Sequence, residues 1–528
     1  MHPQVLLTDF CGGDDLARFT AALAHLRTHP GTTLLIPPGT YRISTPRARK
    51  AQASVMSGAF GKNPEPTMFS PHYVYDRGLD FDGHVDSTVL ADGVTLLVDG
   101  FMEPVSIRNC RNVTVQGLTI DHARKPYSKG IVIASAPDGS YTAIFTDAIN
   151  PDMPTPRKCF FSQRTGVYEP RVKFRELNVV DPHTIHGTLE AESTEFLPEV
   201  GDELYLCHTY HSRPAVLIEE AKNTTLRNIT IHSNPGMGIT AQHAEDVCIE
   251  HLRVVPSPGD HMSTNTDATH FASCRGTIRI SDSEFFGQGD DSVNVHTYYY
   301  TPHALGECTY RFTVDAPTFT HTQSIDYPLV GDTLALVETD SLTPIFTCRV
   351  TEVAIDQEHL AAVVITDAPL PLAENAQLVA DLDAVPRLEF VGCRARSHFA
   401  RSVLVKCREA LIENCVIEDV FENAVKVAAE SYWKEGIHTE QIVIRNCRFA
   451  NNGRKSAECG GIAVYMDVPR ADALVHGSLL IENCEVVTPF SRHAIVVKNT
   501  KHAILHNNRA QSLGEPIVIG DGVVARID

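Results

Sequence analysis

The stretches TTLRNITIH (224–232) and VCIEHLRVV (247–255) are two copies of one short pattern, in which apolar and polar residues alternate. Further copies occur at 113–121, 277–285, 388–396, 410–418, 442–450, 479–487 and 503–511. Matching positions are 22–24 residues apart, with longer intervals of 32 and 37 residues near the C-terminus. A fixed period of this length is typical of a solenoid, in which each turn buries its apolar face only by stacking on its neighbours.

The period favours an all-β chain folded as a right-handed parallel β-helix of the pectate-lyase-like kind. A leucine-rich repeat fits less well, because Leu does not dominate the copies and no helical segment follows each of them. An Asn or Cys recurs at one place in the copies, and this indicates an inward-facing ladder at a turn.

The N-terminal region contains the one convincing helix. From Asp14 to Arg27 the apolar residues recur at helical spacing, and the strand-and-turn segment GTTLLIPPGTYRI follows. The helix is expected to cap the open end of the solenoid, where free strand edges would otherwise pair with other chains.

Two stretches interrupt the period, and each contains a V-G-D-x-L segment, VGDELYL (200–206) and VGDTLAL (330–336). The shared segment predicts two similar small β-barrels inserted into the solenoid, on a face that often binds ligands. The predicted division is a capped N-terminal part of the helix, a first barrel, central turns carrying the site, a second barrel and a C-terminal part, at residues 1–129, 130–212, 213–304, 305–385 and 386–528.

Composition limits the classes of partner. The formal net charge is −20, which disfavours nucleic acid, anionic membranes and polyanionic polysaccharides and suits a neutral substrate. No apolar run is long enough to span a membrane, and the N-terminus lacks the features of a signal peptide. We therefore expect a cytoplasmic protein, or a secreted or periplasmic one if a leader has been removed. The 14 cysteines show no disulfide or metal-ligand spacing, so we expect no metal and no cofactor.

The segment NTDATHFASCRGTIRISDSEFFGQGDDSVNVH (265–296) is the richest in chemistry. Asp290 follows Asp267 by 23 residues, about one turn, so Asp267 should lie beside the Asp290–Asp291 pair on the neighbouring turn. Strand alternation alone would point Asp291 inward, so the chain should bend near Gly289 to turn both carboxylates outward. Three clustered carboxylates should keep at least one proton near neutral pH, as acid–base glycoside hydrolysis requires. A calcium site is the competing interpretation.

NTD followed one turn later by GQGDD resembles the aspartate trio of polygalacturonases. Over nearly the whole chain, through NPGMGITAQHAEDVCIEHLRVV, TDATHFASCRG and DDSVNVH, the sequence resembles glycoside hydrolase family 110, the α-1,3-galactosidases. The resemblance implies an inverting, metal-independent, exo-acting enzyme that removes terminal α-1,3-linked galactose from blood-group-B-like or linear ends. It implies Asp290 as general acid, with Asp267 and Asp291 positioning and deprotonating water. The sequence departs from the family pattern at GQGDD and at Thr297, where Gly is expected.

Residues near the trio are expected to bind the sugar. Strand alternation points Asn294 and His296 outward beside the acid, and His270 lies three residues after Asp267. The single tryptophan, Trp433, could stack on a sugar ring. Gln242 is added from the family-like GITAQH segment. The expected partner is a neutral galactosyl oligosaccharide, and a homodimer is possible.

Other functions remain open from the sequence. A polygalacturonase-like hydrolase lacks its usual basic clamp here, although Lys406 and Lys426 could lie on adjacent turns. A non-catalytic carbohydrate-binding β-helix would carry more aromatic side chains than this chain has. A polysaccharide lyase on the same fold would need a calcium site and a basic residue beside it.

Overall fold

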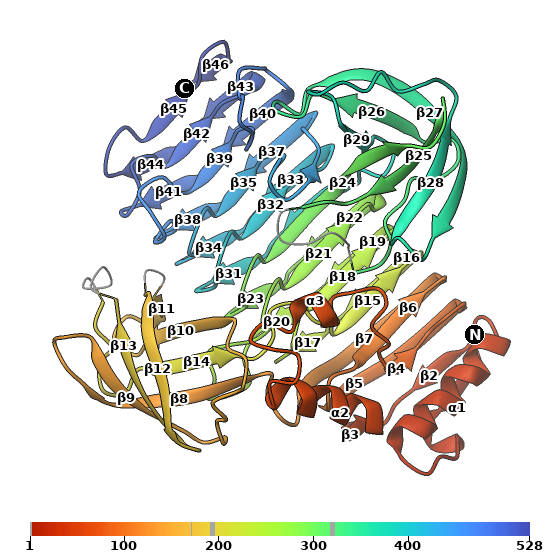
Figure 1. The fold of residues 1–528 in the computed structure, drawn as a ribbon, viewed down its shortest axis with the longest axis vertical. Helices are drawn as coiled ribbons and strands as arrows, with labels where there is room; N and C mark the ends of the chain where they lie inside the picture. Colours follow the sequence, from red (N-terminus) through yellow and green to blue (C-terminus); the bar gives the residue numbers. More distant parts are fainter. Residues whose placement is uncertain (1–2, 170–171, 191–195, 317–322) are drawn as a thin grey trace.

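The computed structural model describes residues 3–169, 172–190, 196–316 and 323–528. The chain forms a right-handed parallel β-helix with two antiparallel modules inserted into it (Figure 1), which confirms the predicted fold class. Its turns stack strands into three parallel ladders that enclose one apolar core.

The first ladder contains β5 (Val85–Asp99), β7 (Arg111–His122), β16 (Lys222–Arg227), β19 (Glu245–Glu250), β22 (Arg275–Ser281), β30 (Arg387–Val391), β33 (Glu409–Glu413), β37 (Gln441–Arg445), β40 (His476–Glu482), β43 (Thr500–His506) and β46 (Val524–Ile527). The second begins with β3 (Gly39–Ser44) and the far halves of β5 and β7. It continues through β17 (Thr230–Ile231), β20 (Arg253–Val254), β23 (Glu284–Phe286), β31 (Arg394–Arg396), β34 (Val416–Glu418), β38 (Arg448–Ala450), β41 (Glu485–Thr488) and β44 (Arg509–Ser512).

The third ladder carries the site. It contains β4 (Arg77–Asp80), β6 (Glu103–Arg108), β15 (Val216–Glu219), β18 (Ile239–Gln242), β21 (Thr269–Ala272), β24 (Val293–Ala304), β32 (Val403–Val405), β35 (Val425–Val427), β39 (Ile462–Val464), β42 (Ile495–Val497) and β45 (Ile517–Ile519). The short β36 (Glu435–Gly436) pairs antiparallel with β24.

Stacked columns of aliphatic side chains hold the turns together. One column runs through the first ladder in register and is buried at every position: Leu226, Ile249, Ile280, Phe390, Ile412, Ile444, Ile481 and Leu505. Full burial of such a side chain stabilises the fold by about 1.5–3 kcal/mol. Outward neighbours form ion pairs between turns, such as Arg227 with Glu250 at 2.6 Å, and exposed pairs of this kind contribute only about 0–1 kcal/mol.

A left-handed residue marks the corner between the first and second ladders on eight successive turns. All eight have φ between 51° and 68°: Asn228, His251, Asp282, Gly392, Asn414, Asn446, Asn483 and Asn507. Asn, Asp and Gly enter this region most readily, which explains the recurring Asn of the sequence pattern. The following residue turns inward, and Cys393, Cys415, Cys447 and Cys484 are buried there, as the predicted ladder requires.

The N-terminus closes the first turn. Helix α1 (Asp15–Thr28) begins where the Asp14 side chain accepts a hydrogen bond from the Ala17 amide at 2.8 Å, and its apolar face is buried against the core. The predicted cap is thus present. The remaining N-terminal elements are β1 (Gln4–Leu6), the 3-10 turn η1 (Leu7–Asp9), β2 (Thr33–Leu35), α2 (Pro46–Met56) and α3 (Glu65–Met68).

The first insertion is a curled seven-stranded antiparallel sheet around its own core, which includes Tyr141, Phe145 and Phe160. In spatial order its strands are β11 (Val167–Glu169), β10 (Arg157–Ser162), β14 (Glu203–Cys207), β8 (Tyr127–Ser135), β9 (Ser140–Phe145), β13 (Thr184–Leu189) and β12 (Phe174–Asp181).

The second insertion closes into a barrel, because its pairings return to β24. The ring runs from β24 through β25 (Thr309–Thr313), β28 (Ala361–Thr366), β27 (Pro344–Asp356), β26 (Thr333–Val337) and β29 (Leu378–Asp381) back to β24. In the part of the chain that the structure describes, no helix has the length and apolar character to cross a membrane.

Candidate active site

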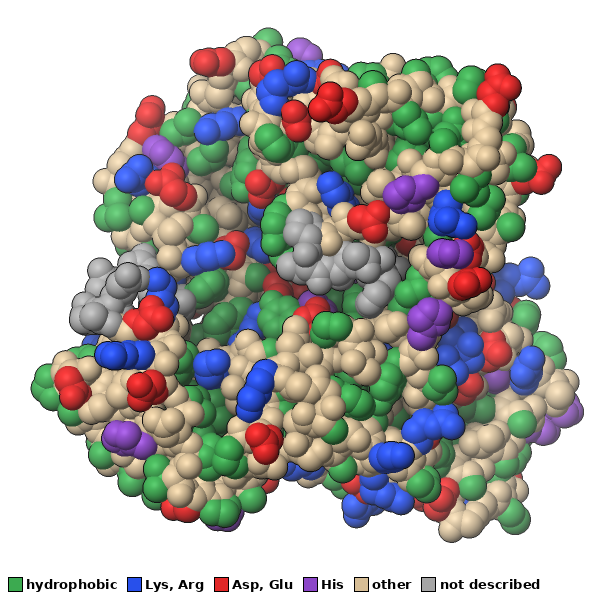
Figure 2. All heavy atoms as spheres, in the orientation of Figure 1, with side chains coloured by type: hydrophobic (Ala, Val, Ile, Leu, Met, Phe, Trp, Pro, Cys, Tyr) green, Lys and Arg blue, Asp and Glu red, His purple; other side chains and the backbone are tan. Residues whose placement is uncertain are grey.

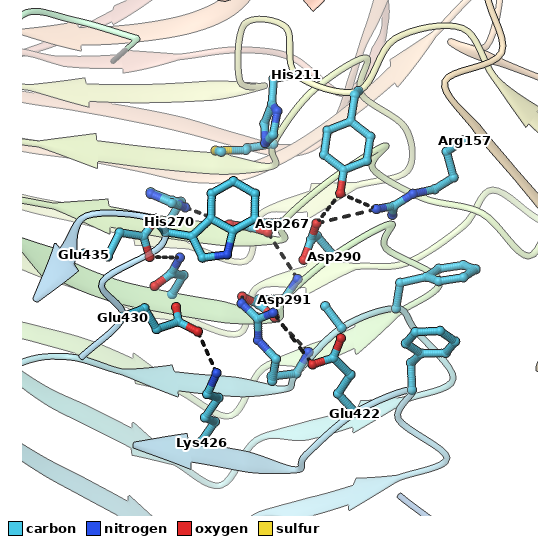
Figure 3. Close-up of a pocket in the computed structure, with 18 of the residues that line it drawn as sticks. Arg157, His211, Asp267, His270, Asp290, Asp291, Glu422, Lys426, Glu430 and Glu435 are labelled. Carbon is cyan, nitrogen blue, oxygen red and sulfur yellow. Dashed lines mark hydrogen bonds and ion pairs between the residues drawn. The ribbon is translucent and has the colours of Figure 1, made fainter. Parts of the chain in front are cut away.

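A cavity of about 730 Å³ lies on the third ladder, between the first insertion and the later turns of the helix. Figure 2 shows this face hollowed near its middle, and Figure 3 shows the charged side chains that converge there. The walls come from the turns before β21 and β24, from the first insertion, from helix α3, and from the long connections around residues 421–435. The volume is in the usual range for small-ligand sites.

The three aspartates meet in this cavity. In the β21–β24 pairing, Thr269 faces Val293, so the turn is 24 residues long here and Asp267 stacks on Asp291. This corrects the sequence interpretation, in which a 23-residue spacing stacked Asp267 on Asp290. Asp290 lies beside the column, and the nearest carboxyl oxygens of the trio are all within 4.8 Å of one another.

Backbone hydrogen bonds fix the column. The Asp291 amide donates to Asp267 Oδ1 at 3.1 Å, and the Arg401 amide donates to Asp291 Oδ1 at 2.8 Å. Each carboxylate therefore accepts the N–H of the residue one turn above it. The chain bends before β24 as predicted. Gly289 is required there, since a Cβ on it would lie 2.1 Å from the Asn265 carbonyl oxygen.

Asp290 is held by donors from the first insertion. The Tyr210 hydroxyl donates to Asp290 Oδ2 at 2.8 Å, and the Arg157 guanidinium lies 3.5 Å from the same oxygen. Arg157 also stacks on the rings of Tyr210 and Phe399. Burial alone would raise the pKa of Asp290, but Arg157, Arg401 and the Tyr210 hydrogen bond together lower it below its ordinary value.

Asp291 has the opposite tendency. It is buried, and burial together with the neighbouring charges of Asp290 and Asp267 raises its pKa well above the ordinary value, despite the Arg401 guanidinium 2.9 Å away. The two adjacent carboxyls titrate as a pair, and Asp291 is the one that retains a proton more readily.

Asp267 faces a histidine pair. Its Oδ2 lies 2.7 Å from His270 Nδ1, and His270 Nε2 lies 2.8 Å from His296 Nε2. His296 is fully buried behind His270, and burial lowers the pKa of His296 to about 4. The His296 ring is therefore neutral at physiological pH.

A network of buried ion pairs forms the wall next to the histidines. Lys406 contacts both Glu435 and Glu430, and Lys426 binds Glu430 at 2.6 Å. Burial alone would raise the pKa values of Glu430 and Glu435, but the lysines hold that of Glu430 well below the ordinary value, and His296 with Lys406 does the same for Glu435. Both glutamates line the cavity as carboxylates.

Comparison with known proteins relates this chain to enzymes. Residues 165–305, which include the trio, match the family described as glycosyl hydrolases family 28. Alpha-1,3-galactosidase A of Shewanella woodyi is 26% identical over 482 residues, covering 85% of this chain and 76% of that protein. The chain is a glycoside hydrolase. Alpha-1,3-galactosidase A of Bacteroides fragilis is 24% identical over 523 residues, covering 93% and 84%. The resemblance inferred from the motifs is confirmed.

The A-module of the mannuronan C-5 epimerase AlgE4 of Azotobacter vinelandii aligns with the hydrolase over 99% of each chain, at 11% identity and a TM-score of 0.40. A likeness at that level says nothing about activity, and the assignment of the fold rests on the strand pairings.

Most residues predicted to bind substrate in this glycoside hydrolase border the cavity. His270, Asn294 and Trp433 line it, with His270 and Asn294 on adjacent turns. His296 is displaced by one layer, behind His270. Gln242 lies elsewhere. Its side-chain amide donates to Asp326 at 2.9 Å and to the Ser324 carbonyl, because the chain that precedes β26 covers the position on β18 that would otherwise face outward.

Several residues of the site were not found from the sequence. Arg157 and Tyr210 belong to the first insertion, whose strands do not follow the solenoid period. Arg401 stands 110 residues after Asp291, one turn away only once the second insertion is removed from the count. Glu430 and Glu435 lie in a long connection. The 32-residue interval that contains them was the one available signal.

Proposed function

We propose that this hydrolase removes terminal α-1,3-linked galactose from oligosaccharides or glycoconjugates, acting from the chain end and with inversion. The observation that supports it most is the aspartate trio, stacked across two turns and supplied with its own cations, in a chain similar to alpha-1,3-galactosidases over most of its length. A pocket with walls from four parts of the chain suits a terminal sugar better than a continuous polymer.

The charge of the cavity supports a neutral sugar. Its lining contains twice as many acidic as basic side chains, namely Glu65, Asp267, Asp290, Asp291, Glu422, Glu430, Glu435 and Asp467 against Arg157, Arg401, Lys426 and Lys455. All four cations form ion pairs with acidic groups of this lining. A uronate would meet an excess of negative charge, so the polygalacturonase-like alternative and the lyase alternative are both disfavoured.

In the proposed reaction, Asp290 protonates the glycosidic oxygen as its bond to the anomeric carbon breaks. A water held by Asp267 and Asp291 attacks that carbon from the opposite side and gives a proton to Asp267. Burial and the neighbouring carboxylates favour the proton on Asp291 over Asp290. We therefore propose that the two adjacent carboxyls share one acidic proton and that substrate binding transfers it to Asp290.

The stereochemistry of the reaction can be tested directly. Most inverting glycosidases keep about 6.5–9.5 Å between the two carboxyl groups, against about 5–5.5 Å in retaining ones. The nearest oxygens of this trio are within 4.8 Å of one another, so their separation does not itself support inversion. Inversion is proposed from the family resemblance. Proton NMR of the first-formed sugar should show β-galactose, and α-galactose would refute it.

Substitution of each aspartate separates the roles. Asp290→Asn should reduce the rate by about 10²–10⁴-fold on poor leaving groups and much less on activated aryl α-galactosides, whose departure needs little protonation. Asp267→Asn should reduce both rates alike. If Asp291→Asn shows the leaving-group dependence and Asp290→Asn does not, Asp291 is the acid. Near-normal activity in all three variants would contradict the site assignment. Azide can also be added to the Asp267 or Asp291 variant, and a galactosyl azide of retained configuration would then indicate a covalent intermediate.

Catalysis is proposed to need no metal. The trio could also bind a cation, since carboxylates are the ligands calcium prefers. Dialysis against EDTA should leave the rate within about twofold, because acid, base and charge compensation are all supplied by side chains. If EDTA abolished activity and calcium restored it, the trio would be a metal site and the metal-independent mechanism would be wrong.

A further inference from the structure

The donor and the acceptor of each hydrogen bond in the His270–His296 pair beside Asp267 can be deduced from its partners. Among the described residues, the hydrogen-bond partner of His296 Nδ1 is the Thr297 carbonyl oxygen, 3.1 Å away. A carbonyl only accepts, so Nδ1 must carry the ring proton of His296. Because burial keeps this ring neutral, its Nε2 has no proton and must accept.

The direction of the next bond follows. His270 Nε2 lies 2.8 Å from His296 Nε2, so His270 is the donor and carries a proton on Nε2. Its other nitrogen, Nδ1, lies 2.7 Å from Asp267 Oδ2. A second proton must occupy that contact, on the nitrogen or on the oxygen. A proton on the nitrogen makes this contact a charge-assisted hydrogen bond between an imidazolium and a carboxylate, which favours the nitrogen.

We propose that His296 holds His270 as an imidazolium, and that this cation keeps Asp267 ionised as the base that activates water. The proposal rests on the proposed hydrolytic function for its consequence, but the protonation state follows from the hydrogen-bond partners of the pair and from the burial of His296. His296 is a positioning residue, because it acts through His270 and does not line the cavity.

The surroundings of His270 are consistent with a cation. The Glu435 carboxylate lies 3.7 Å from His296 Nε2, too far for a hydrogen bond but close enough to favour positive charge on the pair. Lys406 opposes this, but it is paired with both Glu435 and Glu430. The Tyr298 ring packs edge-on against His296, and its pKa is raised well above the ordinary value, so it adds no charge.

The arrangement gives each aspartate of the trio its own cation. Asp290 has Arg157 at 3.5 Å, Asp291 has Arg401 at 2.9 Å, and Asp267 has His270 at 2.7 Å. The third of these cations differs from the two arginines, because an imidazole carries its charge only when both ring nitrogens hold a proton.

The experiment is nitrogen NMR of the full chain labelled with ¹⁵N-histidine, without substrate, using His270→Asn to assign the His270 signals. We expect both ring nitrogens of His270 to be protonated at pH 7, and Nε2 of His296 to be bare. A neutral His270, in either tautomer, would overturn the proposal. This reading needs no activity, so it stands apart from any failure of the proposed function.

Two variants of one residue test the consequence. His296→Gln keeps an acceptor for His270, whereas His296→Phe fills the same buried space without one. We expect Phe to make His270 neutral, to lower kcat about tenfold or more and to move the acidic limb of kcat/KM to higher pH. Gln should largely preserve all three properties. Equal behaviour of the two variants would overturn the positioning role, and a doubly protonated His270 in the Phe variant would overturn the proposed mechanism.

Discussion

The two insertions contain the same tight turn, formed by the V-G-D-x-L segment, but its aspartate makes different contacts in each. In VGDELYL and VGDTLAL, the Asp side chain accepts the amide of the residue three positions earlier, Glu199 for Asp202 at 2.8 Å and Leu329 for Asp332 at 2.5 Å. In the first insertion this turn serves the module itself. In the second, Asp332 also binds Arg275 of the β-helix and lies beside Asp381.

The difference shows how one structural unit takes two roles. The first insertion supplies Arg157 and Tyr210 to Asp290, so it completes the candidate active site. The second is a closed barrel, and among the described residues its strands β25 to β29 contribute nothing to the cavity lining. It is anchored instead, through Asp332 and through Asp326, which accepts from Tyr300 and Ser273. The shared V-G-D-x-L segment therefore predicts a shared tight turn, but neither the closure of the sheet nor the role of the module.

The largest effect is expected from a substitution that tests the proposed catalytic role of the first insertion. Arg157→Leu should lower kcat/KM by about 10²–10³-fold, the usual effect of removing one preorganised charge partner. Because Arg157 lowers the pKa of Asp290, its loss should also move the basic limb of the pH profile to higher pH. The matched control is Arg311→Leu, which removes an arginine–aspartate pair in the second insertion and should leave the rate within twofold. Similar losses in both would contradict the division of roles.

The next effect concerns the anchor of the second insertion. Burial and Asp332 raise the pKa of Asp381 from 3.8 to about 8, so the folded protein binds this proton more tightly than the unfolded chain. The contribution to stability is complete below about pH 4 and is lost as the pH rises through 8. Asp381→Asn should remove this slope in the unfolding temperature between pH 5 and 8.5, and raise that temperature at the alkaline end.

Asp202→Asn is the control for this measurement, because it alters the equivalent turn of the first insertion without a neighbouring carboxyl pair. It should lower the unfolding temperature about equally at every pH. A slope unchanged in Asp381→Asn would show that the anchor does not titrate.

The smallest effect concerns Gln242. Because its amide is bound to Asp326 and Ser324, Gln242→Ala should leave KM within about twofold and lower the unfolding temperature modestly, by the loss of one buried hydrogen bond. His270→Asn, which changes a residue that lines the cavity, provides the contrast in KM and kcat. A tenfold rise in KM for Gln242→Ala would indicate that Gln242 contributes to sugar binding, as the sequence predicted.

Much of the fold and the centre of the site followed from the sequence, because both depend on a local period. Asp267 and Asp291 lie on successive turns with no insertion between them, so their meeting could be counted, although the count was wrong by one residue. The contact of Arg401 with Asp291 could not be predicted by counting residues along the chain, since a whole barrel separates them. Arg157 and Tyr210 reach Asp290 through the docking of a separate module, and Gln242 was covered by a segment from far along the chain.

The column of left-handed corner residues has a consequence for how such a chain can vary. Each turn repeats the same backbone reversal at the same place, from Asn228 to Asn507, so the turns on that edge are interchangeable units. A single added or lost residue there would shift the inward column by one place and expose it, whereas a whole turn could be gained or lost without disturbing its neighbours. Variation in length is therefore confined to the opposite side, where the long connections already form the walls of the pocket.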